Sequence, residues 1–175
     1  MQRDVIATND LQFPPFDVWA TRWGLLACGD HAKRDFNCMT VSWGSMGVMW
    51  GKPFVMVVVR PTRYSFEFME RFGDFTLAVF PPQFKDALNV LRSRYGREMD
   101  KVGNSGLTPM ASREVASPSW EEAELILECR KMYFGDLEPR HFMDEDIPQM
   151  YHNDYHRMYF GEVVLAAGTA AYRRS

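Results

Sequence analysis

The segment Asn37–Gly44 has the sequence NCMTVSWG, and its side chains alternate in character. One face of an extended chain would carry Met39, Val41 and Trp43, and the other would carry Cys38, Thr40 and Ser42. A period of two is typical of a β-strand. The segment therefore predicts a strand that has one small, polar face.

Apolar segments on both sides of this stretch predict further strands. Phe54–Val59 is entirely apolar and rich in valine, so we expect a strand that is buried on both faces. Gly44, Gly47 and Gly51 precede it and predict a bend or a hairpin. The remaining predicted strands are Trp23–Cys28, Asp74–Phe80, Ala123–Tyr133, and His156–Ala167 with an interruption at Gly161.

Helical spacing is confined to short segments. Ser65–Phe72 carries Phe66 and Met69 on one face, and Pro82–Ser93 is amphipathic with a proline near its first turn. A third short helix is a candidate over Arg97–Val102. Because strands outnumber helices, we predict a mainly β fold, a β-barrel with short helices, and not a doubly wound sheet.

Length and composition restrict the class of protein. The 175 residues contain no repeat or linker, so we expect a single domain over residues 1–175. The formal charge of -3 argues against a nucleic-acid partner. The longest apolar run is far shorter than the roughly 20 residues of a membrane span, and no apolar leader opens the chain. We therefore expect a cytoplasmic protein whose three cysteines, Cys28, Cys38 and Cys129, are buried and form no disulfide framework.

Familiar catalytic motifs are missing. The sequence has no GxGxxG after a strand, and no GxxxxGK[ST], HExxH or GxSxG. His152 and His156 are four residues apart, but Asn153 and Asp154 between them indicate a turn and not one helical face. We therefore expect these two histidines to be polar surface residues near the start of a strand, and we predict no metal site.

The segment Arg60–Ser65, RPTRYS, has the chemistry of a phosphate site. It combines two guanidinium groups, two hydroxyls and the start of a helix within six residues. Free N–H groups at a helix start bind phosphate, and arginine matches phosphate oxygens bidentately. The alternative is an ordinary helix start that Thr62 or Ser65 caps, with two solvated arginines.

The segment NCMTVSWG can supply the other half of a nucleotide site. A strand edge at Thr40–Ser42 can present backbone N–H and C=O groups to a planar ring, with Trp43 as an apolar wall. The two segments together meet the requirements of flavin mononucleotide (FMN), which needs phosphate donors and a wall for its ring. The alternative is a half-buried strand with Trp43 in the core.

Several short motifs occur in an order that resembles a known family. They are NCMTVSWG, the WGKP of Trp50–Pro53, VVVRPTRYS, the FTL of Phe75–Leu77, GREMDK, LECRKMY and DYHRMYFGE. This order resembles the flavin reductase-like, flavoredoxin-type family from about Trp23 to Leu165. The family often has Ser-Gly-Arg-Asp where this chain has Arg94–Glu98, so the resemblance is weaker at this end of the site.

The resemblance implies a Greek-key split barrel that forms a homodimer and binds FMN non-covalently between its subunits. It implies contacts to the flavin ring from Asn37, Thr40, Val41, Ser42, Trp43 and Lys101. It implies phosphate contacts from Arg60, Thr62, Arg63 and Ser65. His141 and His156 are further candidates for contact with the ring or a substrate, and their alternative is a hydrogen-bonded histidine at the barrel rim.

The expected activity is that of an FMN-dependent oxidoreductase in which the flavin carries the chemistry and no side chain is named as catalytic. NADH or NADPH is the expected donor, and without a dinucleotide fingerprint it would have to stack directly on the flavin. One alternative is an electron carrier of the flavoredoxin type that serves a redox protein partner. Another is a non-enzymatic β-barrel that binds some other anionic aromatic ligand.

Overall fold

The structure is a computed structural model that describes residues 1–93 and 101–174. Most of the predicted helix over Arg97–Val102, and the segment Arg94–Glu98, lie outside the described residues. The strands are β1 (Asp4–Val5), β2 (Gly24–Asp30), β3 (Asp35–Val41), β4 (Gly44–Met49), β5 (Lys52–Val59), β6 (Asp74–Val79), β7 (Pro109–Met110), β8 (Ser119–Trp120), β9 (Leu125–Asp136) and β10 (Arg157–Gly168). The helices are α1 (Pro15–Asp17), α2 (Tyr64–Arg71) and α3 (Lys85–Ser93), with short helical turns η1 (Thr8–Asp10), η2 (Val18–Arg22), η3 (Pro82–Phe84), η4 (Pro139–His141), η5 (Pro148–Met150) and η6 (Ala170–Tyr172).

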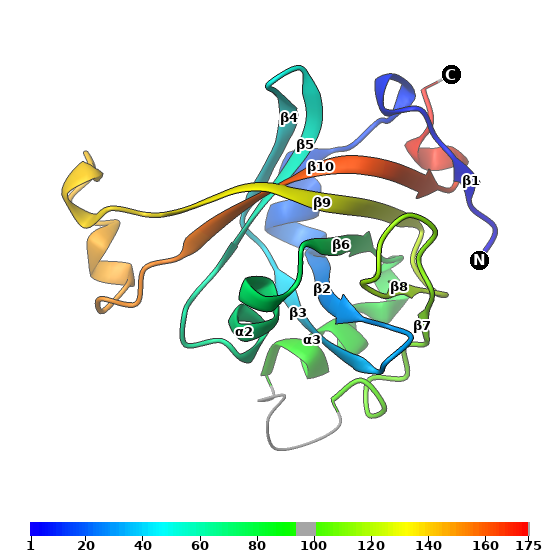
Figure 1. Cartoon of the computed structure of the whole chain (residues 1–175), viewed down its shortest axis with the longest axis horizontal. Helices are drawn as coiled ribbons and strands as arrows, with labels where there is room; N and C mark the ends of the chain where they lie inside the picture. The colour runs from blue at the N-terminus through cyan, green and yellow to red at the C-terminus, as the bar shows by residue number, and fades with distance from the viewer. Residues whose placement is uncertain (94–100, 175) are drawn as a thin grey trace.

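The main sheet is antiparallel, in the order β3-β2-β6-β9-β10-β5-β4, with β1 paired to β10. Its two end strands, β3 and β4, are consecutive in the chain, and only Ser42 and Trp43 separate Val41 from Gly44. Three peptide units span at most about 11 Å. The sheet must therefore curl until its ends approach each other, which makes it a barrel (Figure 1).

Apolar side chains pack against both faces of the central strands. On β2, Leu26 and Cys28 belong to one buried cluster, which includes Val55 and Val57 of β5. The intervening residues Leu25 and Ala27 belong to a second cluster, together with Leu88 and Leu91 of α3. The amphipathic helix α3 therefore covers the outer face of the sheet, and the apolar run at Trp23–Cys28 reflects burial on both sides.

Carboxylates within these strands bind the segment of residues 111–118. Glu128 of β9 is only 2% exposed and accepts hydrogen bonds from the backbone N–H groups of Arg113 (3.0 Å) and Glu114 (2.6 Å). Asp74 of β6 accepts one from the backbone N–H of Ser117 (3.0 Å) and another from its hydroxyl (2.6 Å). These bonds satisfy the carboxylates and fix this segment against the sheet.

The strands β9 and β10 extend together beyond the rest of the sheet (Figure 1). Their register shifts at Phe160/Gly161, which is a bulge. A Cβ at Gly161 would lie 2.6 Å from Phe75 Cε1, so the strand passes this point only with glycine. The outer ends carry residues 137–156, which we call the tip segment and which include η4 and η5.

Most of the predicted elements are confirmed within a few residues. The glycines at 44–51 belong to a hairpin, in which β4 and β5 meet at a turn with positive φ at Trp50 (54°) and Gly51 (72°). The prediction that Phe54–Val59 is buried on both faces is wrong for Met56 and Val58, which are partly exposed because one face of β5 is only half covered. Cys28, Cys38 and Cys129 are buried, as predicted. Among the described residues, no helix is both long enough and apolar enough to cross a membrane.

The corner between β3 and β4 should tolerate no side chain at Gly44. A Cβ there would lie 2.6 Å from the Trp19 ring and 2.7 Å from the Met56 carbonyl oxygen. We expect Gly44→Ala to lower the free energy of unfolding by about 1–3 kcal/mol, as overpacking does, in urea denaturation followed by circular dichroism. Gly73→Ala is the control, because a Cβ at Gly73 meets nothing within 4 Å. Equal stabilities of the two variants would contradict the prediction.

Candidate functional site

A cavity of about 300 Å³ lies where β3 ends, beside the start of α2 and the end of α3. Its residues come from segments far apart in the sequence, and β4 brings them together because it pairs with β5 and places Val57 opposite Gly44. The lining residues are Asn37, Met39, Thr40, Val41, Ser42, Trp43, Val58, Arg60, Arg63, Tyr64, Ser65, Leu91, Arg92, Lys101 and His156.

A buried hydrogen bond joins the two segments that the sequence singled out. The Asn37 amide donates to the Ser65 hydroxyl at 2.8 Å. Both side chains are buried, with 5% and 3% of their surfaces exposed. NCMTVSWG and RPTRYS therefore line one cavity, and this bond joins the first half of β3 to the first turn of α2.

The start of α2 faces the cavity without a side-chain cap. Arg63 is the N-cap residue, and no side chain there bonds to the helix. The alternative that Thr62 or Ser65 merely caps the helix is therefore wrong. Arg63 and Ser65 line the cavity, whereas Thr62 does not, since its hydroxyl donates to Asp154 at 2.7 Å.

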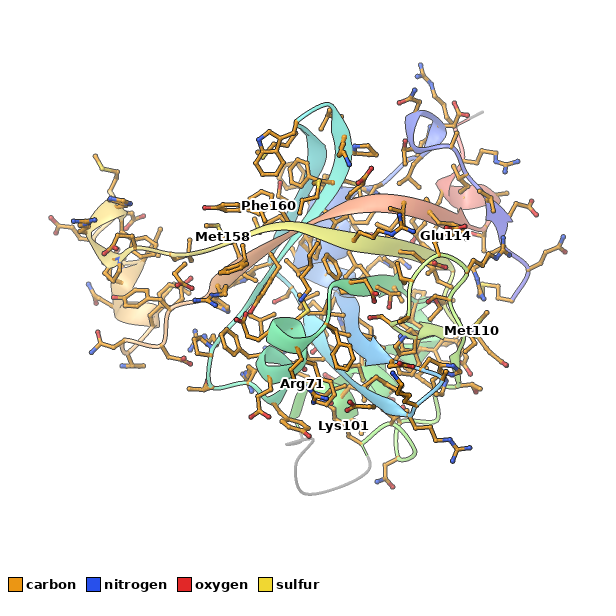
Figure 2. All side chains as sticks on the ribbon, viewed as in Figure 1. Arg71, Lys101, Met110, Glu114, Met158 and Phe160 are labelled. Carbon is orange, nitrogen blue, oxygen red and sulfur yellow. The ribbon has the colours of Figure 1, made fainter. Side chains whose placement is uncertain are left out.

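The cavity is positively charged. Arg60, Arg63, Arg92 and Lys101 line it, and no carboxylate does so among the described residues. Lys101 is 5% exposed and its ammonium donates to the Cys38 carbonyl oxygen. Burial lowers the pKa of Lys101 below its usual value, and Arg63 lowers it further. This is an electrostatic setting for an anionic ligand. Figure 2 shows Lys101 on the side of the barrel where α2 and α3 lie.

An exposed aromatic face borders the same cavity. Trp43 is 43% exposed, so the alternative that places it in the core is wrong. Its ring centroid lies 5.2 Å from that of His156 and 6.5 Å from that of Tyr151. A planar ligand that enters the cavity can therefore contact the indole, as the sequence analysis expected of a wall for a ring.

His156 is held in its neutral form. Burial lowers its pKa to about 4, and Arg60 and Arg63 act in the same direction against Asp154. Its Nδ1 lies 3.3 Å from the Tyr151 hydroxyl. At neutral pH the imidazole thus offers hydrogen bonds to the cavity without adding a charge.

The other histidines lie away from the cavity. His141 is exposed on η4 and does not line it. His152 has a φ of 48° and Asn153 a φ of 65°, which confirms the predicted turn before His156. Within residues 1–93 and 101–174, no three His, Cys, Asp or Glu side chains are arranged to hold a metal.

Comparison with known proteins identifies the family. Residues 19–168 match the family described as flavin reductase like domain. The chain belongs to this family. A search of functionally curated proteins found no significant match.

Solved structures of family members share the fold. An FMN-binding domain of a flavin reductases-like enzyme from Shewanella baltica OS155 is 15% identical, with a TM-score of 0.67, and the match covers 95% of this chain and 77% of that one. The flavoredoxin of Desulfovibrio vulgaris (Miyazaki F) is 19% identical, with a TM-score of 0.66 and coverage of 98% and 78%. An NADH:FAD oxidoreductase of Streptomyces globisporus C-1027 is 17% identical, with a TM-score of 0.66 and coverage of 90% and 81%. The predicted split-barrel fold of the flavin reductase-like family is confirmed.

Five cavity residues of this family member were not predicted. They are Met39, Val58, Tyr64, Leu91 and Arg92. Met39 and Tyr64 lie inside the two quoted segments, so their position was a usable signal. Leu91 and Arg92 end the amphipathic helix α3, and only the packing of that helix on the barrel brings them to the cavity.

The pH dependence of stability should reveal the buried His156. Between about pH 6.5 and 4 the unfolded chain binds a proton at this position that the folded chain does not, so stability falls as the pH falls. We expect His156→Gln to lose less stability than the wild type between pH 7 and pH ~4.5, measured by urea denaturation. His141→Gln, which removes an exposed imidazole, is the control. If the free energy of unfolding of His156→Gln fell with pH as steeply as that of the wild type, the prediction would be wrong.

Proposed function

We propose that the chain binds FMN non-covalently in this cavity and passes electrons from NADH or NADPH through the flavin to an acceptor. The Asn37–Ser65 hydrogen bond carries the proposal, because it joins a cationic helix start to a strand edge with an exposed indole. A phosphate dianion fits the first part, and an aromatic ring fits the second. Membership of the flavin reductase like family supports the same ligand.

Each part of the cavity suits one part of FMN. The phosphate would be held by Arg60, Arg63 and Ser65 of the lining, and by Thr62 once its hydroxyl has left Asp154. The ring would be held by Asn37, Thr40, Val41, Ser42, Trp43 and Lys101, with His156 beside Trp43. Met39 and Val58 would add apolar contacts within the cavity.

FMN, when bound here, would supply the hydride and electron transfer between donor and acceptor. The side chains of this protein orient the ring, exclude water and set the charge around it. No side chain in the cavity is assigned a proton-transfer role, and neutral His156 is a hydrogen-bonding group.

The sequence has no dinucleotide fingerprint, so a nicotinamide donor would have to bind in the same cavity as the flavin and not at a nucleotide site of its own. The similar Streptomyces protein is named an NADH:FAD oxidoreductase, which supports a nicotinamide donor. The similar Desulfovibrio protein is named a flavoredoxin, which supports the second candidate function, an electron carrier with a redox protein partner.

We also propose that two copies form a homodimer. The hairpin turn between β4 and β5 presents Val48 and Trp50, which are 75% and 60% exposed, beside Tyr133 at 52%. The rings of Trp50, Tyr133 and Phe160 lie 5.8–6.3 Å apart. Figure 2 shows Phe160 and Met158 on β10 near this hairpin. A contiguous aromatic surface of this kind is typical of an interface.

The dimer would also account for the small cavity and for the position of His141. A volume of about 300 Å³ is at the lower end for a ligand site, so a second subunit would complete the enclosure. His141 could reach a flavin only from the extended tip segment of the other copy. A single domain over residues 1–175 and a cytoplasmic location belong to the same proposal.

Anaerobic mixing with NADH and NADPH tests the function. We expect the purified protein to bind FMN with a flavin absorption spectrum, and the absorbance to be lost within seconds of adding one of the two donors. If both donors leave the spectrum unchanged and a reduced redox protein bleaches it, the carrier function holds instead. A colourless protein that ignores added FMN would contradict both functions.

Lys101 provides a test of the ring position. A cation near the reduced, anionic ring favours reduction, so we expect Lys101→Ala to lower the midpoint potential of bound FMN by roughly 20–60 mV. Lys101→Arg keeps the charge and is the matched control. Spectroelectrochemical titration measures the potentials of both variants. An unchanged potential in Lys101→Ala would contradict the proposal that Lys101 lies near the ring.

A further inference from the structure

The tip segment contains a strained turn beside the residues that are proposed to bind the phosphate. His152 and Asn153 both have positive φ values, 48° and 65°, which non-glycine residues seldom adopt. The turn ends at Asp154, whose N–H donates to the Tyr151 carbonyl at 2.9 Å. Such strain persists only where surrounding contacts hold it, and here the residues on both sides of the turn contact Arg60 and Thr62.

Asp154 contacts two residues of the proposed phosphate site, Thr62 and Arg60. Its Oδ2 accepts a hydrogen bond from the Thr62 hydroxyl at 2.7 Å and lies 3.9 Å from Arg60 Nη1. The Arg60 guanidinium also lies over the Tyr151 ring, 5.2 Å from its centroid, and donates to the Met150 carbonyl at 3.4 Å. The tip segment thus engages Arg60 and Thr62 of RPTRYS, and Arg60 also lines the cavity, as Arg63 and Ser65 do.

We propose that Asp154 is a specificity-determining residue for the phosphate end of the flavin. Its carboxylate competes with the phosphate for Thr62 and Arg60, and it disfavours a phosphate dianion more than a flavin with less charge at this position. This inference rests on the proposed function, because it takes FMN as the ligand and RPTRYS as its phosphate site.

Electrostatics makes the effect depend on ligand charge. The phosphomonoester of FMN carries nearly two negative charges above its second pKa of about 6. FAD carries two negative charges spread over its two phosphates, so only one of them lies on the phosphate that corresponds to that of FMN, and riboflavin carries none. The repulsion from Asp154 is therefore greatest for FMN, smaller for FAD because half of its charge lies farther away, and absent for riboflavin. The attraction from Arg63, Arg92 and Lys101 is common to the wild type and the variant.

The variant Asp154→Asn separates charge from structure. Its amide oxygen can still accept the Thr62 hydrogen bond, so the turn and the position of Thr62 are retained while the charge is removed. Asp154→Ser is a second variant that also removes the charge and keeps a hydrogen-bonding group. Asp144→Asn is the matched control, because Asp144 is an exposed carboxylate of the same tip segment that accepts a hydrogen bond from the N–H of Asp146.

The experiment is a set of flavin titrations at pH ~8, above the second phosphate pKa of about 6, at low and high salt. Flavin fluorescence would give the Kd values for FMN, FAD and riboflavin with the full chain and each variant. We expect Asp154→Asn to bind FMN about 3- to 10-fold more tightly than the wild type at low salt, with a smaller gain at high salt. The gain for FAD should be smaller, and riboflavin affinity should not change.

Three outcomes would overturn the inference. They are unchanged or weaker FMN binding in both Asp154 variants, equal tightening for all three flavins, and the same gain in Asp144→Asn. A folded wild-type protein that binds none of the flavins would overturn the proposed function and this inference with it. That result is distinct, because the other outcomes all require measurable flavin binding by the wild type.

Discussion

The barrel depends on the short connection between its outermost strands. Ser42 and Trp43 alone join β3 to β4, although these strands lie at opposite ends of the sheet order. A sheet of this width can satisfy so short a link only by curling. Because β4 then runs antiparallel to β5, the residues after Val59 emerge beside Trp43. Closure of the barrel and assembly of the site are therefore the same event.

The second requirement is that the central strands be covered on both faces. Helix α3 covers one side of β2 with Leu88 and Leu91, and the segment of residues 111–118 covers more of the sheet through buried bonds to Glu128. The packing of α3 on the sheet also affects the cavity, because the end of this helix brings Arg92 to the lining. The groups that stabilise the barrel thus also set the charge of the site.

Opposing charges meet at the phosphate end of the cavity. Among the residues that the structure describes, the charged side chains that line the cavity are all cations, and burial keeps His156 neutral. The tip segment supplies the opposing carboxylate, Asp154, from a turn with two strained residues. In the proposed function, affinity for the anion would come from the body of the protein, and discrimination among anions from the tip segment. The two properties could then change independently.

The sequence by itself determined the spacing of apolar residues along each strand and helix, and the types of residue available to the site. Alternation in NCMTVSWG, the valines before Arg60 and the amphipathic Pro82–Ser93 specified strands and helices, because these patterns depend only on neighbours along the chain. The order of the motifs also identified the family. Burial on both faces of β5 was predicted wrongly, since the coverage of a face depends on distant elements.

The tertiary structure alone decided which groups meet. The Asn37–Ser65 hydrogen bond, the exposure of Trp43 and the contact of Asp154 with Thr62 join residues 28 to 92 positions apart or depend on what packs nearby. No periodicity encodes such pairs, because the closed sheet and its long β9–β10 hairpin set their distances. The residue types therefore specified the chemistry of the cavity, and the closure of the barrel specified the positions of the side chains that line it.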